Sequence, residues 1–257
     1  MEHREPPLTA HSTPKRGGDV ASQTARAFIG LRELLLRGEF ARGERISELS
    51  LVARLGMSRT PIRMALERLA HLGLLDVGPT GGFLVREFSV DEVRDAIELR
   101  GVLEGTAARL AAERLRTPSE LEPLRRCLRA LEELQELSIK TFSIYMDRNE
   151  AFHRAIVDLA KSDMLRRALA YTNSLPFASP SAMVFPTSML AESEATLAIA
   201  QDQHRRLFEA IENREGSRAE HIGREHARLG RRVFEIALSD DDILSRVPGG
   251  PLIHVPD

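Results

Sequence analysis

The sequence has few cysteines and few aromatic residues, and it has no long apolar run. Cys127 is the only cysteine among 257 residues, so an internal disulfide is excluded and a reducing, cytoplasmic setting is expected. No window approaches the roughly 18 consecutive apolar residues of a membrane span, so we expect no membrane partner. Hydrophobic residues make up 42% of the chain and charged residues 29%, which is typical of globular domains and excludes low-complexity disorder for most of the chain.

The formal net charge is only −2, but the charge is unevenly distributed. Residues 20–88 carry a net charge of +3, and residues 89–257 carry −5. This division indicates a small basic segment that binds a polyanion, joined to a larger acidic segment.

The basic segment predicts three helices. Apolar residues recur at helical spacing over residues 21–37. Ser47 is a candidate N-cap for a short second helix. Thr60 is the expected cap of the third helix, with Pro61 at its first position, where the missing N–H costs nothing.

A hairpin is expected directly after these helices. Two short apolar stretches, residues 74–77 and 83–85, flank the Gly-rich sequence of residues 78–82. That pattern predicts two antiparallel strands with a tight tip.

No strand signal returns after residue 88, and the remaining chain predicts helices. The expected helices span residues 90–116, 118–137, 141–161, 164–173, 188–213 and 217–238. The fold class is therefore mainly α, with an N-terminal winged helix-turn-helix (residues 20–88) followed by a C-terminal all-helical antiparallel bundle (residues 89–238). We expect residues 1–19 to be a disordered leader, residues 174–187 to be irregular and residues 239–257 to be a loose C-terminal tail.

The third helix has the features of a helix that reads DNA. Its first turn carries guanidinium and hydroxyl groups, on Ser58, Arg59, Thr60 and Arg63. Arginine pairs bidentately with guanine or clamps phosphate, and the free N–H groups of a helix start bind anions. Gly81 and Gly82 at the hairpin tip would let the backbone approach phosphates. The two arginines alone favour a structural subdomain with solvated side chains, whereas the whole pattern favours a DNA interface.

Residues 43–75 (GERISELSLVARLGMSRTPIRMALERLAHLGLL) resemble the N-terminal domain of GntR-family transcription regulators. The matching positions are Gly43, Ser47, Glu48, Leu55, Gly56, Ser58, Arg59, Thr60, Pro61, Arg63, Ala65, Leu66, Leu69 and Gly73. The resemblance implies that Arg59 and Thr60 contact bases or phosphates, that Arg63 contacts a base, and that the hairpin is a wing near the minor groove. Arg45 is a further candidate phosphate contact.

The acidic segment carries histidines on several expected helices. Asn149 and His153 are four residues apart, hence on one helix face. His204 and His226 lie on the last two long helices. A turn near Gly216 would make these helices antiparallel and place the two histidines at similar heights along them. His221 is about 140° from His226 around the helix, so the two should not share a face and His221 is not a candidate ligand. A bundle histidine is more often a structural residue than a ligand, and spacing alone does not decide between the two.

Residues 91–238 resemble FCD, the all-helical effector domain of FadR-like GntR regulators. The likeness is carried by DAIELRGVLEGTAARLAA, NEAFHRAIVDLAKSDML and HRRLFEAIENREGSRAEHIGREH. It implies that Asn149, His153, His204 and His226 bind a divalent metal, and that Arg100 pairs with an effector carboxylate. Zinc or nickel suits imidazole ligands. Many relatives have Asp where this chain has Asn149, so the site would keep its full positive charge and favour an anionic effector.

We interpret the chain as a homodimeric transcription regulator, a repressor rather than an activator, that binds double-stranded operator DNA and a small organic acid. Two recognition helices must span half-sites about 34 Å apart, which favours a dimer. Effector binding is expected to bias the domain orientation at residues 86–90. The alternatives are a metal-dependent hydrolase fused to a DNA-binding domain, a metal-free regulator with a purely organic pocket, and an architectural DNA-binding protein. No HExxH, GxSxG or P-loop motif supports an enzyme.

Overall fold

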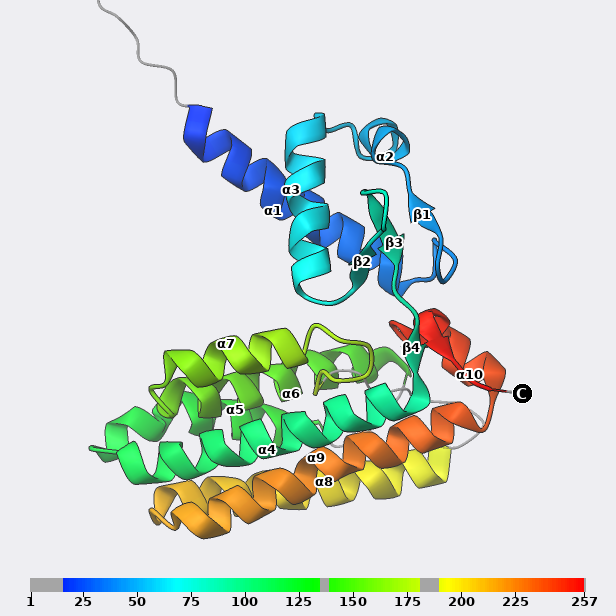
Figure 1. Cartoon of the computed structure of the whole chain (residues 1–257). Coiled ribbons are helices and arrows are strands. Elements are labelled where there is room, and N and C mark those ends of the chain that lie inside the picture. The colour runs from blue at the N-terminus through cyan, green and yellow to red at the C-terminus, as the bar shows by residue number, and fades with distance from the viewer. Residues whose placement is uncertain (1–15, 135–138, 181–189, 257) are drawn as a thin grey trace, which may run out of the picture.

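Two units lie one above the other in the computed structural model, which describes residues 16–134, 139–180 and 190–256 (Figure 1). The upper unit contains α1 (Arg16–Leu36), β1 (Arg45–Ile46), α2 (Glu48–Leu55), α3 (Arg59–His71), β2 (Leu75–Val77) and β3 (Phe83–Val85). The joint and lower unit contain β4 (Phe88–Ser89), α4 (Val90–Arg114), α5 (Glu122–Glu132), α6 (Ile139–Leu159), α7 (Asp163–Thr172), α8 (Leu190–Glu212) and α9 (Gly216–Leu238). The C-terminal elements are α10 (Asp241–Arg246), a 3-10 turn (Gly250–Leu252) and β5 (Ile253–His254).

The upper unit is a winged helix-turn-helix. Ser47 caps α2 by accepting a hydrogen bond from the Ser50 N–H at 3.3 Å, as its sequence position indicated. The cap of α3 is Ser58, so the expectation of Thr60 at that place was wrong. Pro61 is therefore the third helical residue, where an N–H would still have no intrahelical acceptor.

The predicted hairpin is confirmed, and a third strand completes its sheet. β2 and β3 pair antiparallel, with Asp76 opposite Leu84. β1 pairs with the other edge of β3, with Arg45 also opposite Leu84. β1 is not predictable from the sequence, because a strand of two residues is too short to show alternation.

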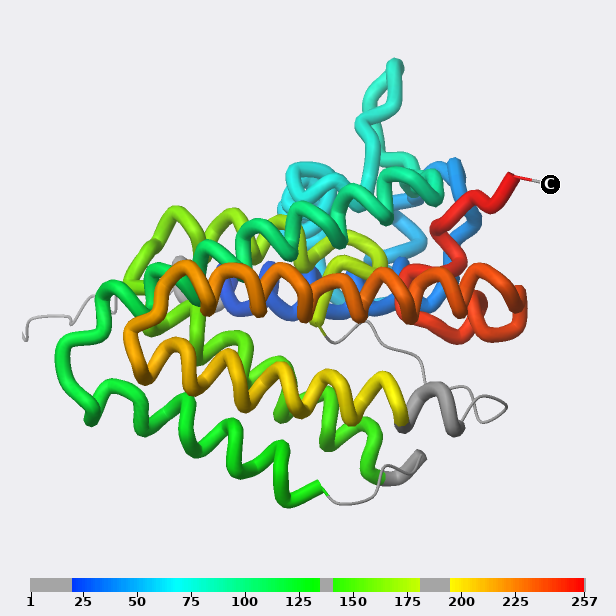
Figure 2. Tube along the Cα trace, turned by 90° about the horizontal axis from the view of Figure 1, so that it is seen from below, coloured from blue at the N-terminus to red at the C-terminus, as the bar shows by residue number. Residues whose placement is uncertain are grey.

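The lower unit is a helical bundle in which α4, α8 and α9 lie side by side (Figures 1 and 2). A capping box starts α4, because Ser89 and Glu92 each bond the other's backbone N–H. Small residues let α4 and α9 approach closely, since a Cβ on Gly223 would lie 3.0 Å from the Gly105 Cα. The helix expected over residues 118–137 was wrong in extent. A 3-10 turn (Pro118–Leu121) precedes α5, and residues 135–138 lie outside the described part.

Both ends of the chain differ from expectation where they are described. α1 begins at Arg16, so residues 16–19 are helical instead of part of a leader, and residues 1–15 lie outside the described part. The C-terminal tail is ordered, because Asp240 caps α10 and β5 pairs in parallel with β4. The irregular stretch is described only up to residue 180, where residues 174–180 form turns.

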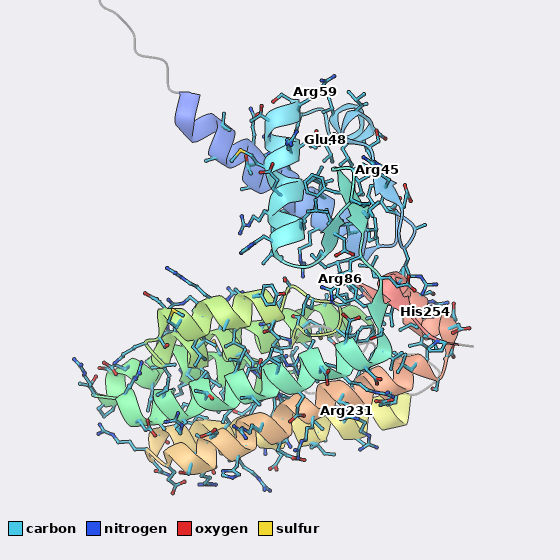
Figure 3. The ribbon with its side chains drawn as sticks, in the orientation of Figure 1. Arg45, Glu48, Arg59, Arg86, Arg231 and His254 are labelled. Carbon is cyan, nitrogen blue, oxygen red and sulfur yellow. The ribbon has the colours of Figure 1, made fainter. Side chains whose placement is uncertain are left out.

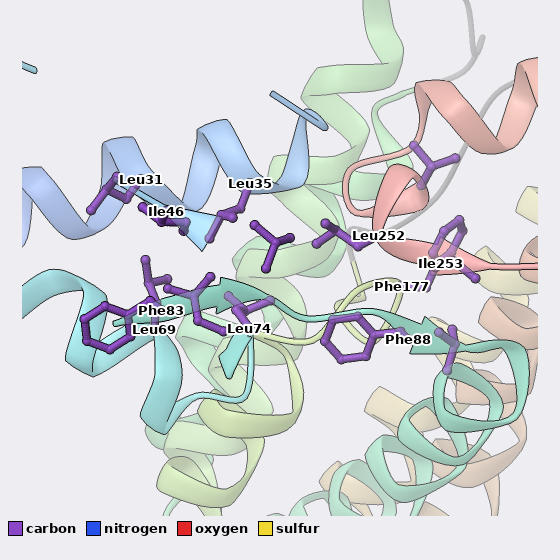
Figure 4. Packing of buried hydrophobic residues seen from close by; sticks show 14 of the residues in the cluster. Leu31, Leu35, Ile46, Leu69, Leu74, Phe83, Phe88, Phe177, Leu252 and Ile253 are labelled. Carbon is purple, nitrogen blue, oxygen red and sulfur yellow. The ribbon is translucent and has the colours of Figure 1, made fainter. Parts of the chain in front are cut away.

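One hydrophobic cluster connects the two units (Figure 4). It joins Leu31 and Leu35 of α1 to Phe88 of β4 and to Ile253 of β5. A second cluster, which includes Phe152 and Leu207, fills the interior of the bundle. Among the described residues, no helix is both long enough and apolar enough to cross a membrane.

Candidate functional site

The first turn of α3 presents the predicted DNA-contacting residues to solvent. Ser58, Arg59, Thr60 and Arg63 are all exposed. Arg59 lies at the end of the upper unit farthest from the bundle (Figure 3). The Ser58 side chain makes no capping hydrogen bond, so the N–H groups of the first turn remain available to a phosphate.

Arg45 lies against the tip of the wing. It donates hydrogen bonds to the Thr80 Oγ1 at 3.2 Å and to the Gly81 carbonyl at 2.8 Å. Gly81 and Gly82 have φ angles of 82° and 80°, a conformation that favours glycine. A Cβ on Gly82 would also lie 3.0 Å from the Arg45 Nη2. The structure thus gathers three predicted residues, Arg45, Gly81 and Gly82, into one basic corner.

A groove of about 640 Å³ separates α3 from the wing, and Arg63 lines it together with Gly81 and Gly82. Arg63 forms an ion pair with Glu67 at 3.3 Å, one helical turn away. Both side chains are more than half exposed, so this pair contributes little stability and can open when DNA approaches.

Three histidines from three helices converge inside the bundle. His153 (α6), His204 (α8) and His226 (α9) are all buried. The Nε2 atom of His226 lies 3.1 Å from the Nε2 of His204 and 3.2 Å from the Nε2 of His153. These three residues form a group that could hold a metal ion.

The opposite nitrogen of each ring faces an oxygen atom. His153 Nδ1 lies 3.4 Å from the Glu104 carboxylate, while His204 and His226 Nδ1 each lie 3.0 Å from the amide oxygen of Gln201 and Gln203, respectively. The Gln201 amide donates to the Leu131 carbonyl, which leaves its oxygen turned toward His204. His204 must then carry its proton on Nδ1 and direct the Nε2 lone pair inward.

The Nε2 spacing fits a bound cation. Nitrogen atoms about 2.0–2.1 Å from one zinc ion are about 3.3–3.4 Å apart at the tetrahedral angle and about 2.9 Å apart at a right angle. The observed 3.1 and 3.2 Å fall between these values. Inward lone pairs repel one another unless a positive charge lies between them.

The imidazoles are neutral in this environment. Burial lowers the pKa of His153 to about 3, and the charge of Arg100 acts in the same direction. Burial, followed by the neighbouring His153, lowers the pKa of His226 to about 3. The pKa of His204 is also well below its ordinary value, chiefly because of burial. Neutral imidazole is the form that binds metals.

Two buried polar atoms in this region make no hydrogen bond to any residue that the structure describes. The Asn149 amide donates to the Pro180 carbonyl at 3.1 Å, but its Oδ1 has no hydrogen bond. Arg100 donates to the carbonyls of Ala178 and Ala227, but its Nε has no hydrogen bond. The Asn149 acceptor, one turn from His153 on α6, suits a metal ion, and the cationic Arg100 N–H without a hydrogen bond suits an anionic ligand.

Glu104 links the predicted arginine to the histidines. Its carboxylate lies 3.9 Å from the Arg100 Nε and 3.4 Å from the His153 Nδ1. Burial raises the pKa of Glu104, although the charges of Arg100 and His226 oppose that rise. Glu104 was not predicted from the sequence, where its one signal is its position four residues after Arg100 on the same helix face.

Gln201 and Gln203 were also not predicted, because no motif marks a contact with His204 three residues along α8 or with His226 on α9. His221, which was not a candidate ligand, does not belong to the group of His153, His204 and His226. Its exposed ring faces the Ser217 carbonyl of its own helix.

The fold and its two sites define a class of protein: a DNA-binding regulator whose winged helix-turn-helix is joined to a helical domain with a buried polar site. Residues 23–85 match the family described as "Bacterial regulatory proteins, gntR family", and residues 95–229 match the FCD domain.

Known proteins agree with this class. The chain is 31% identical to a probable D-xylose utilization operon transcriptional repressor of Paenarthrobacter nicotinovorans, over 80% of this chain and 85% of that protein. It is 26% identical to the transcriptional repressor RspR of Escherichia coli, over 84% of this chain and 90% of that protein. The solved structure of E. coli McbR/YncC superposes with a TM-score of 0.59 at 25% identity, over 84% of this chain and 97% of that chain.

The chain belongs to the GntR family and carries an FCD domain. It is a DNA-binding transcriptional regulator, and its family and relatives are regulators, not enzymes.

Proposed function

We propose that this regulator is a homodimeric repressor whose operator affinity is controlled by a small carboxylate, bound beside a divalent metal in the FCD domain. The observation that carries the proposal is the convergence of three Nε2 atoms, from His153, His204 and His226, in the same buried region as Arg100, whose Nε makes no hydrogen bond to a described residue. The names of the two relatives described above support repression rather than activation.

The metal ligands in this proposal are His153, His204, His226 and the Asn149 Oδ1. All four are neutral, so the ion would keep its charge of 2+ and supply an electrostatic site for an anion. Zinc or nickel suits three imidazoles. Arg100 would pair with the carboxylate of the effector, since a guanidinium forms charge-assisted hydrogen bonds with carboxylates.

On the DNA side, Ser58, Arg59, Thr60 and Arg63 would enter the major groove, while Arg45, Gly81 and Gly82 would contact the backbone near the minor groove. Each chain supplies one recognition helix, so a dimer would place two helices on the half-sites of a palindrome. Operator and effector affinities must then be coupled reciprocally.

A thermal-shift panel of small organic acids, with and without Zn²⁺ or Ni²⁺, tests the sensor half of this proposal. A carboxylate that raises the melting temperature only with metal present, and then releases the chain from its operator, supports it. Stabilisation by an acid without metal favours the metal-free regulator. An acid that binds without changing operator affinity contradicts the regulatory coupling.

A further inference from the structure

Glu104, Gln201 and Gln203 form an outer shell around the histidines. Each places one oxygen atom next to the Nδ1 of a different imidazole, at 3.4, 3.0 and 3.0 Å. Glu104 (α4) and Gln203 (α8) face rings on other helices, α6 and α9, whereas Gln201 faces His204 on its own helix α8. Two of these contacts are hydrogen bonds and the third is a close approach of the Glu104 carboxylate, and each meets a different ring at the same nitrogen.

We propose that these three residues are positioning residues that hold every imidazole in its Nδ1–H form, and that their acceptor strength sets the metal affinity of the centre. The proposal rests on the metal site of the proposed function. When the Nδ1–H of a ring donates to an oxygen, the proton is fixed on Nδ1 and the Nε2 lone pair is free to bind the metal. The hydrogen bond also raises the basicity of Nε2. Glu104 supplies a carboxylate, whereas Gln201 and Gln203 supply weaker neutral acceptors.

Gln203 offers the clearest test, because it is only partly buried and, among the described histidines, its side chain hydrogen-bonds His226 only. Zn²⁺ affinity is measured in the full chain by competition with a chromophoric chelator. Gln203→Leu removes the acceptor and is expected to weaken Zn²⁺ binding about 10–100-fold. Gln203→Glu replaces the amide oxygen with a carboxylate and is expected to bind Zn²⁺ at least as tightly as the original chain.

Asp202→Asn is the matched control. Asp202 is the neighbouring residue and pairs with Arg206, so this change alters a nearby charge without touching an imidazole. It should leave Zn²⁺ affinity within twofold, and all three variants should melt alike in excess chelator. Equal affinities for Gln203→Leu and the unaltered chain would overturn the positioning role. An unaltered chain without Zn²⁺ affinity would overturn the metal site itself, and the positioning role with it.

An independent observation concerns the C-terminal strap, residues 240–256, which lies outside both family matches. Its buried apolar side chains are Ile243, Leu244, Val247, Leu252 and Ile253. They belong to the cluster that includes Leu31 and Leu35 of α1 and Phe234 of α9. The strap therefore packs between the DNA-binding unit and the bundle (Figure 4).

Polar contacts fasten the strap to the DNA-binding unit and the joint. Its Gly249 N–H donates to the Leu36 carbonyl at 2.8 Å, at the end of α1. Arg42 donates to the Ile253 carbonyl at 2.7 Å. His254 lies 3.2 Å from the Glu87 carboxylate next to β4, where Figure 3 places it close to the joint.

The 175–180 segment connects the strap to the metal and effector site. Its Ala178 and Pro180 carbonyls accept hydrogen bonds from Arg100 and Asn149. Its Phe177 ring packs on Phe234 with 4.7 Å between the ring centroids. Pro176 lies so close to the strap that a Cβ on Gly249 would be 2.8 Å from its Cβ.

We infer that the strap transmits the state of this site to the DNA-binding unit. This inference also rests on the proposed function. A metal ion on the Asn149 Oδ1, or a carboxylate on the Arg100 Nε, repositions the two side chains whose N–H groups hold the Pro180 and Ala178 carbonyls. The 175–180 segment then shifts, and because Phe177 and Pro176 pack against the joint cluster and the strap, the strap moves with it. The C-terminal end of α1 moves with the strap, because the Gly249 N–H is hydrogen-bonded to the Leu36 carbonyl.

Hydrogen–deuterium exchange of the full chain, with and without Zn²⁺ as the probe, tests this route. In the unaltered chain, Zn²⁺ should change exchange at α6, α8 and α9, in the strap, and at the end of α1. Leu252→Ala removes a fully buried strap side chain, and Arg42→Ala removes one fastening contact. Both should keep the response around the histidines and lose at least half of the response at the end of α1.

Arg37→Ala is the matched control, because Arg37, directly after α1, pairs with the exposed Glu33 of that helix. It should retain the complete response. A response at α1 that survives both Leu252→Ala and Arg42→Ala overturns the strap's role, as does a response confined to the bundle of the unaltered chain. No response at the histidines contradicts the metal site, and the strap then has no signal to transmit.

Discussion

Arg100 and Glu104 form a buried ion pair, and its disruption has a magnitude that follows from the structure. The Nε and Oε1 atoms are 3.9 Å apart, and the two side chains are 5% and 8% exposed. At an effective dielectric constant of about 20, unit charges at this distance attract by roughly 4 kcal/mol. Arg100→Met leaves the Glu104 carboxylate buried without its partner. We expect the free energy of unfolding to fall by about 3–5 kcal/mol.

Urea unfolding at pH 7 in excess chelator, followed by circular dichroism, measures this change without any metal contribution. Adding Glu104→Gln to Arg100→Met should restore at least half of the lost stability, because no buried charge then remains unpaired. The control is Arg109→Met on the same helix. Its partners Glu113 and Glu220 are 48% and 23% exposed and stay in contact with water, so the expected change is under about 1 kcal/mol. An Arg100→Met variant as stable as Arg109→Met would refute this reasoning.

Three further predictions concern the DNA interface and the histidines. Arg59→Ala and Arg63→Ala should each cost roughly 1–3 kcal/mol of base discrimination on an operator selected from random duplexes, measured by fluorescence anisotropy; unchanged affinity in both variants contradicts the recognition-helix assignment. Glu67→Gln frees Arg63 from its ion pair and should tighten operator binding by no more than about 1 kcal/mol, so weaker binding in the same assay contradicts this account of Arg63. Acidification from pH 6.5 to 5 should lower the free energy of unfolding of the metal-free chain. In this pH range the histidines of the unfolded chain take up protons, whereas His153 and His226, with pKa values of about 3, stay neutral in the folded chain. The slope is at most about 1.4 kcal/mol per pH unit for each imidazole, and urea unfolding that shows no loss of stability over this range contradicts their burial as neutral rings.

Local signals in the sequence were sufficient for much of the fold. Ser47 and Ser89 mark helix starts, and the Gly-rich sequence at residues 78–82 marks the wing, because each acts on its own neighbourhood. The C-terminal strap was missed for the opposite reason. Its prolines and glycines suggest a loose tail, and its order depends on contacts with α1 and β4, far away along the chain.

The same distinction applies to the metal and effector site. Spacing placed Asn149 and His153 on one face of a helix, but only the family resemblance grouped them with His204 and His226. Glu104 and Gln203 act on rings carried by other helices, so nothing in their own sequence surroundings marks them. The roles of Glu104 and Gln203 depend on contacts between helices, and the periodicity of residues within one helix does not predict such contacts.

The metal content of the chain, purified without chelators and measured by elemental analysis, tests the central proposal most directly. We predict one zinc or nickel ion per chain, and its loss in His153→Ala, His204→Ala and His226→Ala but not in His221→Ala, since His221 lies outside the cluster. A chain that is purified without metal and binds neither added Zn²⁺ nor added Ni²⁺ would contradict the account.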